Sequence, residues 1–227
     1  MIPWVHLDTA TVPGGGELRL MRRGDEFSIM AGAMVLMNSR MNGSETLLAE
    51  LACDRLRGCR NCRVLIGGYG MGFTLRAALA GLGRDAQILV AELVPAIMEW
   101  ARGPMADLTA DCLSDTRVSI REVDVAGLIA SSRSSFDAIL LDVDNGPDGF
   151  SRNANDGLYD LQGLKAARNA LRPKGLLAVW SAAPDREFAN RLVRAGFAVD
   201  EIKARGSKGR GGHHVIWAAT NMIGAAR

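Results

Sequence analysis

The order of apolar and polar positions divides the chain into a short first part and a long second part. In the first part, residues 17–21 alternate polar and apolar side chains, which is typical of a half-buried strand. A turn at 23–25 and a second apolar run at 27–30 predict a hairpin. Ser44 then stands before leucines at helical spacing, as an N-cap does. We therefore predict that residues 1–57 form a small antiparallel β unit followed by a helix.

The second part, residues 58–227, alternates apolar runs with helical patterns, as βαβ units do. Its last two apolar runs are too close together for a helix between them, and they predict an antiparallel hairpin at the sheet edge. We predict an α/β fold with a doubly wound, mostly parallel seven-stranded sheet and helices on both faces. The runs expected as strands are 63–66, 86–91, 117–121, 136–141, 176–180, 197–202 and 215–219.

Composition and charge exclude some classes of binding partner for this protein. The formal net charge of +2 is too close to zero for a nucleic-acid-binding surface, so we predict no nucleic-acid partner. No apolar run approaches the ~20 residues that cross a bilayer. The start, Met1-Ile2-Pro3-Trp4, lacks the basic region and apolar stretch of a secretory signal. We therefore predict a cytoplasmic protein with no membrane partner.

The chain has four cysteines, and Cys59 and Cys62 form a C-x-x-C pair. A zinc site needs two more ligands at suitable spacing, and no second pair of this kind exists. A redox pair usually opens a helix after a strand, whereas this one precedes a strand. We interpret the pair as two reduced thiols and predict no metal site.

Candidate chemistry lies where the predicted parallel strands end, because ligands of open α/β sheets bind beyond these ends. The first such end is the turn Gly67-Gly68-Tyr69-Gly70-Met71-Gly72, where glycine lets the backbone approach a ligand closely. The second is Glu92, which ends the run 86–91 and can accept both hydroxyls of a ribose.

Two further acidic positions follow the next strands. Asp124 can accept a hydrogen bond from an adenine amino group, cap the following helix, or do both. The strand 136–141 ends in Asp142-Val143-Asp144-Asn145, and acids beside so apolar a strand are costly unless they face a cleft or a cation. We predict a functional role for Asp142 or Asp144.

With these residues in place, the chain resembles the class I S-adenosylmethionine-dependent methyltransferases, and within them the spermidine synthase branch. The resemblance covers about residues 60–182 and implies a Rossmann-like fold. The hairpin within 17–37 is similar to the small N-terminal β domain of spermidine synthases. The matching segments are Val64-Leu65-Ile66-Gly67-Gly68, Val90-Ala91-Glu92-Leu93, Val123-Asp124, Phe136-Asp137-Ala138-Ile139-Leu140-Leu141-Asp142 and Leu171-Arg172-Pro173-Lys174-Gly175-Leu176-Leu177.

The resemblance implies a role for each acid. Glu92 is expected to hold the ribose, Asp124 the adenine, and the glycine-rich turn the methionine part of S-adenosylmethionine or its decarboxylated form. Asp142, with Asp144, is the expected base for an attacking amine. Asn145, Arg40 and Glu45 are the expected substrate contacts. The predicted nucleoside contacts are Gly67, Gly68, Tyr69, Gly70, Gly72, Glu92, Leu93, Asp124, Val125 and Asp142.

Two departures from the branch decide between functions. Gly70 stands where spermidine synthases carry an Asp, and Asn145 stands where they carry a second Asp. An Asp in the turn would repel the carboxylate of intact S-adenosylmethionine, and Gly70 removes that repulsion. We therefore predict methyl transfer to a small-molecule acceptor, with aminopropyl transfer to a polyamine as the alternative. A non-catalytic nucleoside-binding module is the third hypothesis, and the acids at Asp142 argue against it.

Three features outside this set remain. The basic, glycine-rich stretch 205–212 is either a mobile lid or anion clamp, or a solvated hairpin loop. The methionines at 34, 37 and 41 lie where the family's N-terminal part covers the site, and we interpret them as packing residues. The hairpins of the first part have exposed edges that a second copy would cover, so we predict a homodimer.

Overall fold

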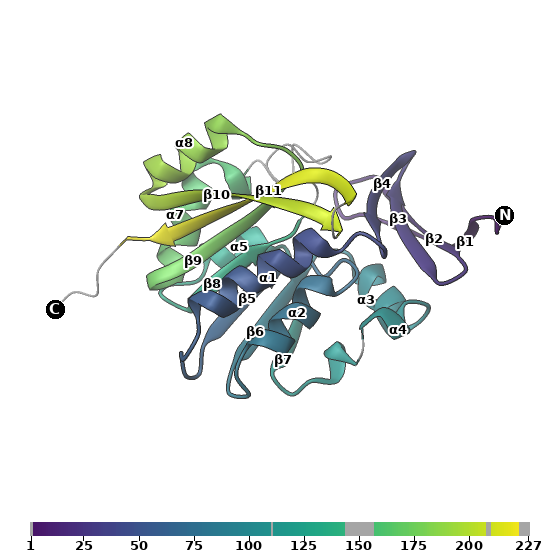
Figure 1. Cartoon of the computed structure of the whole chain (residues 1–227), viewed down its shortest axis with the longest axis horizontal. Coiled ribbons are helices and arrows are strands. Elements are labelled where there is room, and N and C mark those ends of the chain that lie inside the picture. The colour runs from purple at the N-terminus through teal and green to yellow at the C-terminus, as the bar shows by residue number, and fades with distance from the viewer. Residues whose placement is uncertain (1, 110, 144–156, 208–209, 223–227) are drawn as a thin grey trace.

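The computed structural model describes residues 2–109, 111–143, 157–207 and 210–222 and contains two sheets (Figure 1). The N-terminal sheet has four antiparallel strands in chain order. Its inner side packs on the core through Leu20, Phe27 and Ile29. Its strands are β1 (Val5–Thr11), β2 (Glu17–Arg23), β3 (Glu26–Ala31) and β4 (Met34–Asn38).

The large sheet has seven strands in the order β10-β11-β9-β8-β5-β6-β7. The five strands from β9 to β7 run parallel, and β11 is antiparallel to both β9 and β10. This confirms the predicted sheet with its terminal antiparallel hairpin. The strands are β5 (Arg63–Gly67), β6 (Gln87–Glu92), β7 (Val118–Glu122), β8 (Phe136–Leu141), β9 (Leu171–Ser181), β10 (Phe197–Ser207) and β11 (Arg210–Asn221).

Helices cover both faces of the large sheet, α1 and α2 on one face and α5, α7 and α8 on the other (Figure 1). The helical segments are α1 (Gly43–Arg55), α2 (Phe73–Gly81), α3 (Pro95–Arg102), α4 (Ala106–Thr109), α5 (Val125–Ala130), α7 (Leu161–Ala170), α8 (Arg186–Ala195) and a short 3₁₀ turn at Cys112–Ser114. No helix among the described residues is long and apolar enough to cross a membrane.

The central strand β8 shows why the sheet forms from so apolar a sequence. Successive side chains of a strand point to opposite faces, so a strand with helices on both sides must be apolar at every position. Ala138 and Leu140 belong to the core under α1 and α2, whereas Ile139 and Leu141 belong to the core under α5 and α7. All four side chains are buried. The fully buried apolar run from Ala138 to Leu141 therefore ends at Asp142.

The N-terminal sheet is fastened to the large domain beside α3. The indole Nε1 of Trp100 on α3 donates to Asp8 Oδ2 on β1 over 2.7 Å. Within the sheet, the buried carboxylate of Glu26 accepts from Arg23 and Asn38, each over 2.8 Å. The hydrogen bond of Trp100 with Asp8 links the sheet to the large domain, whereas the contacts of Glu26 hold the strands of the sheet together.

Strand β1 is not among the sequence predictions. Of its seven residues only Ala10 is buried, so the alternation that signals a half-buried strand is missing. The proposed domain boundary at residue 57 falls just after α1, and it stays a prediction.

Candidate active site

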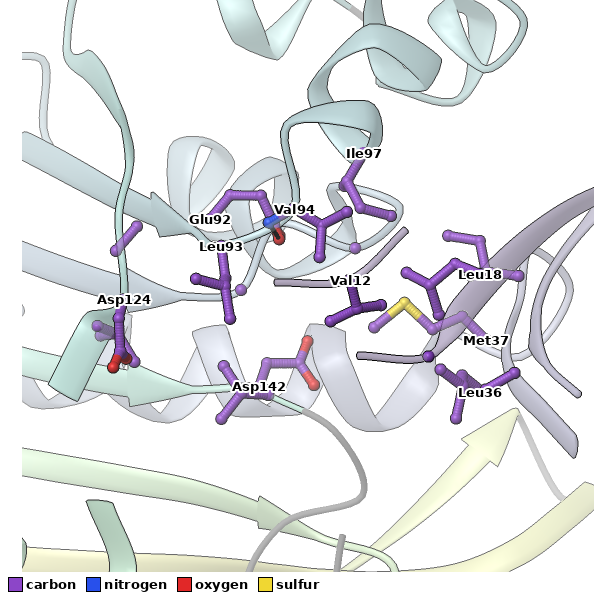
Figure 2. A pocket seen from close by; sticks show the side chains of 18 of the residues that line it. Val12, Leu18, Leu36, Met37, Glu92, Leu93, Val94, Ile97, Asp124 and Asp142 are labelled. Atoms are coloured by element: carbon purple, nitrogen blue, oxygen red, sulfur yellow. Dashed lines mark hydrogen bonds between the residues drawn. The ribbon is translucent and has the colours of Figure 1, made fainter. Parts of the chain in front are cut away.

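A pocket lies between the N-terminal sheet and the ends of β5, β6, β7 and β8 (Figure 2). The side chains of Val12, Leu18, Leu36 and Met37 form its wall on one side, and Asp124 lies at the opposite end of the view, with Glu92 and Leu93 between. The strand ends predicted from the sequence therefore meet at one cavity, and the N-terminal sheet closes it.

The glycine-rich turn follows β5 and brings backbone to the pocket at Gly68 and Gly70. Gly68 has φ +84°, and a Cβ there would lie 2.5 Å from the backbone oxygen of Asp142. Gly70 has φ +54°, and its Cβ would lie 2.5 Å from the Met37 sulfur. Gly68 therefore needs glycine for conformation and for space, whereas at Gly70 the positive φ favours glycine and the end of the Met37 side chain occupies the space beside it.

The other four residues of the predicted turn do not line the pocket. Gly67 packs under Leu141 and Val125, and Gly72 packs on the ring of Tyr69. The Tyr69 side chain is buried, and its backbone N–H donates to Glu92 Oε2 over 2.8 Å. These residues therefore support the turn and do not line the pocket.

Glu92 is the most constrained acid of the pocket, with only 7% of its surface exposed. Its Oε2 accepts from Tyr69 N and its Oε1 from Val94 N, each over 2.8 Å. Burial raises the pKa of this carboxyl group, and the backbone N–H bonds act in the opposite direction. The side chain also lines the pocket, where a carboxylate is the type of acceptor that two vicinal hydroxyls need.

Asp124 caps α5, and its Oδ1 accepts from Ala126 N over 2.8 Å. It also lines the pocket together with its neighbour Val125. The two roles suggested by the sequence are thus compatible, because a carboxylate has more acceptor positions than the cap uses.

Asp142 and Glu45 form a pair of carboxyl groups in the pocket. Asp142 Oδ2 accepts from the Thr74 hydroxyl over 2.9 Å. Burial, and then the charge of Glu45, raise the pKa of Asp142 to about 7, against the opposing effect of the Thr74 hydrogen bond. Burial also raises the pKa of Glu45, whose Oε2 accepts from Ser44 Oγ over 2.6 Å. The charge of Glu45 disfavours ionisation of Asp142, so Asp142 can take up and release a proton near neutral pH.

Several predicted contacts lie elsewhere. Arg40 is 71% exposed, and its Nε lies 3.2 Å from Glu26 Oε2 rather than in the pocket. Asp144 and Asn145 lie outside the described residues, as do Lys208 and Gly209 of the basic stretch. Their roles stay predictions.

Sequence reasoning did not single out Glu17 and Trp180, which line the pocket, or Thr74, which donates a hydrogen bond to the pocket residue Asp142. Thr74 stands in the first turn of the helix after the glycine-rich turn, a position that could have marked it. Trp180 is one residue past the pairing of Val179 with Leu141, so it stands beside Asp142 at the sheet end. Its ring lies against His214, with centroids 4.8 Å apart.

The titratable side chains of described residues that line the pocket are all acidic. Five carboxyl groups line it, and no lysine, arginine or histidine lines it in the part of the chain that the structure describes. Such a cavity favours cationic ligands and disfavours anionic ones. The five acids are Glu17, Glu45, Glu92, Asp124 and Asp142.

Comparison with known proteins supports a nucleoside-dependent transferase. The model of a family described as S-adenosyl-L-methionine-dependent methyltransferase matches residues 94–214. Polyamine aminopropyltransferases of Mycobacterium tuberculosis and Mycobacterium bovis are 28% identical to the chain over 173 residues, which is 74% of it. The match covers 31% of the length of these relatives.

Solved structures share the fold. The spermidine synthase of Thermotoga maritima aligns with a TM-score of 0.77 at 16% identity, over 95% of this chain and 72% of that one. A spermidine synthase in complex with the transition-state analogue AdoDATO aligns with a TM-score of 0.75 at 15% identity, with the same coverage. A probable spermidine synthase from Corynebacterium glutamicum gives 0.66 at 15% identity, over 96% and 80% of the chains.

These comparisons correct the sequence prediction of methyl transfer, which is wrong. The relatives are named for aminopropyl transfer, and the solved structures are spermidine synthases. The error came from Gly70, whose missing carboxylate suggested room for the carboxylate of intact S-adenosylmethionine. Instead, Met37 fills the space beside Gly70, and the Glu45–Asp142 pair adds carboxyl groups from other elements.

Proposed function

We propose that the chain is an aminopropyltransferase. The premise is that it belongs to the class I S-adenosylmethionine-dependent methyltransferase superfamily and to its spermidine synthase-like branch. Its donor would be decarboxylated S-adenosylmethionine, and its acceptor an amine of the polyamine class. The chain matches 31% of the length of its curated relatives, so the proposal concerns the chemistry of this domain.

The observation that carries this proposal is the acidic lining of the pocket. Intact S-adenosylmethionine carries a carboxylate, which would enter a cavity with five acids and no basic side chain among the described residues. Burying an unpaired carboxylate is costly, and neighbouring acids add repulsion. The decarboxylated donor and an amine acceptor are both cationic, so the same charges favour them.

The binding roles follow from position. Asp124 would receive the adenine amino group at one end of the pocket, and Glu92 would accept the ribose hydroxyls in its middle. Gly68 and Gly70 line the same pocket and would lie beside the substituent of the ribose. The acceptor would approach through the part of the pocket that holds Glu45 and Asp142.

Asp142 has the properties that a general base for an ammonium needs. A base with a pKa of about 7 is ionised in a useful fraction at neutral pH and holds a proton once it has taken one. When bound, the donor supplies a carbon attached to sulfonium and a neutral thioether leaving group. Asp142 takes a proton from the acceptor ammonium, which frees the nitrogen lone pair to attack that carbon. Thr74 orients the carboxyl group through its hydroxyl.

Product analysis tests the proposal. The purified chain is incubated with decarboxylated S-adenosylmethionine and 1,4-diaminobutane, 1,3-diaminopropane or spermidine, and mass spectrometry follows methylthioadenosine and the aminopropylated amine. We expect both products in equal amounts, and neither with Asp142→Asn. Asp107→Asn, an exposed position on α4 outside the pocket, is the matched control and should react like the wild type. Absence of both products with every amine would refute aminopropyl transfer.

A cytoplasmic location and a homodimer remain our predictions from the sequence. Exposed apolar side chains on the N-terminal sheet, among them Val5, Met34 and Val35, support pairing through that sheet. Sedimentation analysis of the chain at several concentrations measures the oligomeric state directly.

A further inference from the structure

Met37 brings the N-terminal sheet against the glycine-rich turn at Gly70. It lies on β4, and its sulfur and methyl carbon would be 2.5 and 2.6 Å from a Cβ on Gly70. The Met37 side chain reaches from the sheet towards the middle of the pocket, near Leu18 and Leu36 (Figure 2). The space that a side chain at position 70 would need is therefore filled by a thioether.

The position of Met37 relative to the nucleoside follows from the pocket. Asp124 lies at the end remote from Met37, and Glu92 lies between them (Figure 2). If the adenine lies at Asp124 and the ribose at Glu92, the substituent on the ribose points along the pocket towards Gly70 and Met37. This step rests on the proposed function.

The surroundings of that tail are apolar or acidic. Leu18, Leu36 and Met37 form the wall there, and no basic side chain of the described residues lines the pocket. An ammonium on the tail has carboxyl groups within the same cavity. A carboxylate on the tail would lose its hydration against a thioether and leucines and gain no cation.

We propose that Met37 is a specificity-determining residue that selects the nucleoside by its tail. Packed on Gly70, its side chain fills the space beside the turn with an apolar group. The site then rejects a tail that carries a carboxylate and accepts the decarboxylated tail. The chain thus discriminates by desolvation at this position, without a charged residue in the turn.

Three ligands that share one nucleoside separate the effect of the amine on the tail from the effect of the carboxylate on the tail. Methylthioadenosine has no charged tail, decarboxylated S-adenosylhomocysteine has an amine tail, and S-adenosylhomocysteine adds a carboxylate. Dissociation constants are measured by calorimetry for the wild type and Met37→Lys. Met34→Lys is the matched control, because it places the same charge on the same strand at an exposed position that does not line the pocket.

We expect the wild type to bind S-adenosylhomocysteine at least tenfold more weakly than its decarboxylated form. Met37→Lys should tighten S-adenosylhomocysteine tenfold or more and weaken the decarboxylated form, with methylthioadenosine changed less than twofold. Met34→Lys should keep the wild-type ratio. Should Met37→Lys fail to fold, Met37→Gln carries the test, and the ratio of the two tailed ligands should then narrow.

Two results would overturn the inference: equal wild-type affinities for the two tailed ligands, or a ratio that a folded variant at Met37 leaves unchanged. Failure of the proposed function looks different. In that case the wild type forms no methylthioadenosine from the decarboxylated donor with any amine, whatever the affinities of the three ligands.

Discussion

Replacing Asp142 by asparagine should stabilise the free protein at alkaline pH while it abolishes transfer. The carboxyl group of Asp142 has a pKa of about 7 in the folded chain, against 3.8 for an ordinary Asp. The folded state therefore binds one more proton than the unfolded state between these two pH values. A group with a raised pKa of this kind favours folding at low pH, and that advantage is lost as the pH rises to about 7.

The magnitude follows from the size of this shift. Each pH unit in the window lowers the free energy of unfolding by about 1.4 kcal/mol, so the whole window amounts to about 4 kcal/mol. Asparagine is neutral at every pH, and its oxygen can still accept the Thr74 hydroxyl. The advantage of Asp142→Asn should therefore grow by about 3 kcal/mol between pH 5 and pH 8.

Urea unfolding at pH 5 and pH 8, followed by tryptophan fluorescence, measures this difference. The control Asp107→Asn removes an exposed carboxylate outside the pocket, and it should change stability by the same small amount at both pH values. If the advantage of Asp142→Asn were equal at pH 5 and pH 8, Asp142 would not hold the extra proton. The argument for its role as the base would then fail.

Three further substitutions test separate parts of the site. Thr74→Val removes the hydrogen bond that lowers the pKa of Asp142, so the acidic limb of the pH profile of kcat/KM should move to higher pH; a move to lower pH would contradict this. Gly68→Ala places a Cβ 2.5 Å from the Asp142 backbone oxygen, and thermal unfolding should show a loss of about 1–3 kcal/mol more than for Gly14→Ala, which has a similar φ but nothing within 4 Å. Glu92→Gln leaves one acceptor oxygen for two backbone N–H groups, and calorimetry should show methylthioadenosine binding weakened about 10- to 100-fold, whereas an unchanged affinity would remove Glu92 from the nucleoside site.

The sequence predicts the large sheet well because the signal is local. A strand covered on both faces must be apolar along its buried part, and β8 shows this pattern from Ala138 to Leu141. Strand β1 carries no such signal, because its side chains are almost all exposed and its place depends on pairing with β2. The convergence of Glu92, Asp124 and Asp142 on one pocket follows from strand order alone, since parallel strands end at the same edge.

Contacts between segments that are far apart along the chain cannot be predicted from local sequence in this way. Met37 on Gly70 depends on how the N-terminal sheet docks, and the Glu45–Asp142 pair depends on where α1 begins above β8. Each feature reversed or sharpened an interpretation based on residue type. The neighbourhood of Arg40 is of the same kind, because its Nε lies 3.2 Å from Oε2 of the buried Glu26, and its role as a substrate contact stays a prediction.

The pocket is assembled from two stretches that are separate along the chain. Its apolar wall comes from residues 12–37, which form one contiguous sheet, whereas its strand-end acids come from residues after β5. A protein built in this way can change the part of the cavity beyond the nucleoside without altering the part that binds it. Recombination that exchanges only the N-terminal sheet between related enzymes would therefore transfer the preference for an acceptor, or for a nucleoside tail, from one enzyme to the large domain of another.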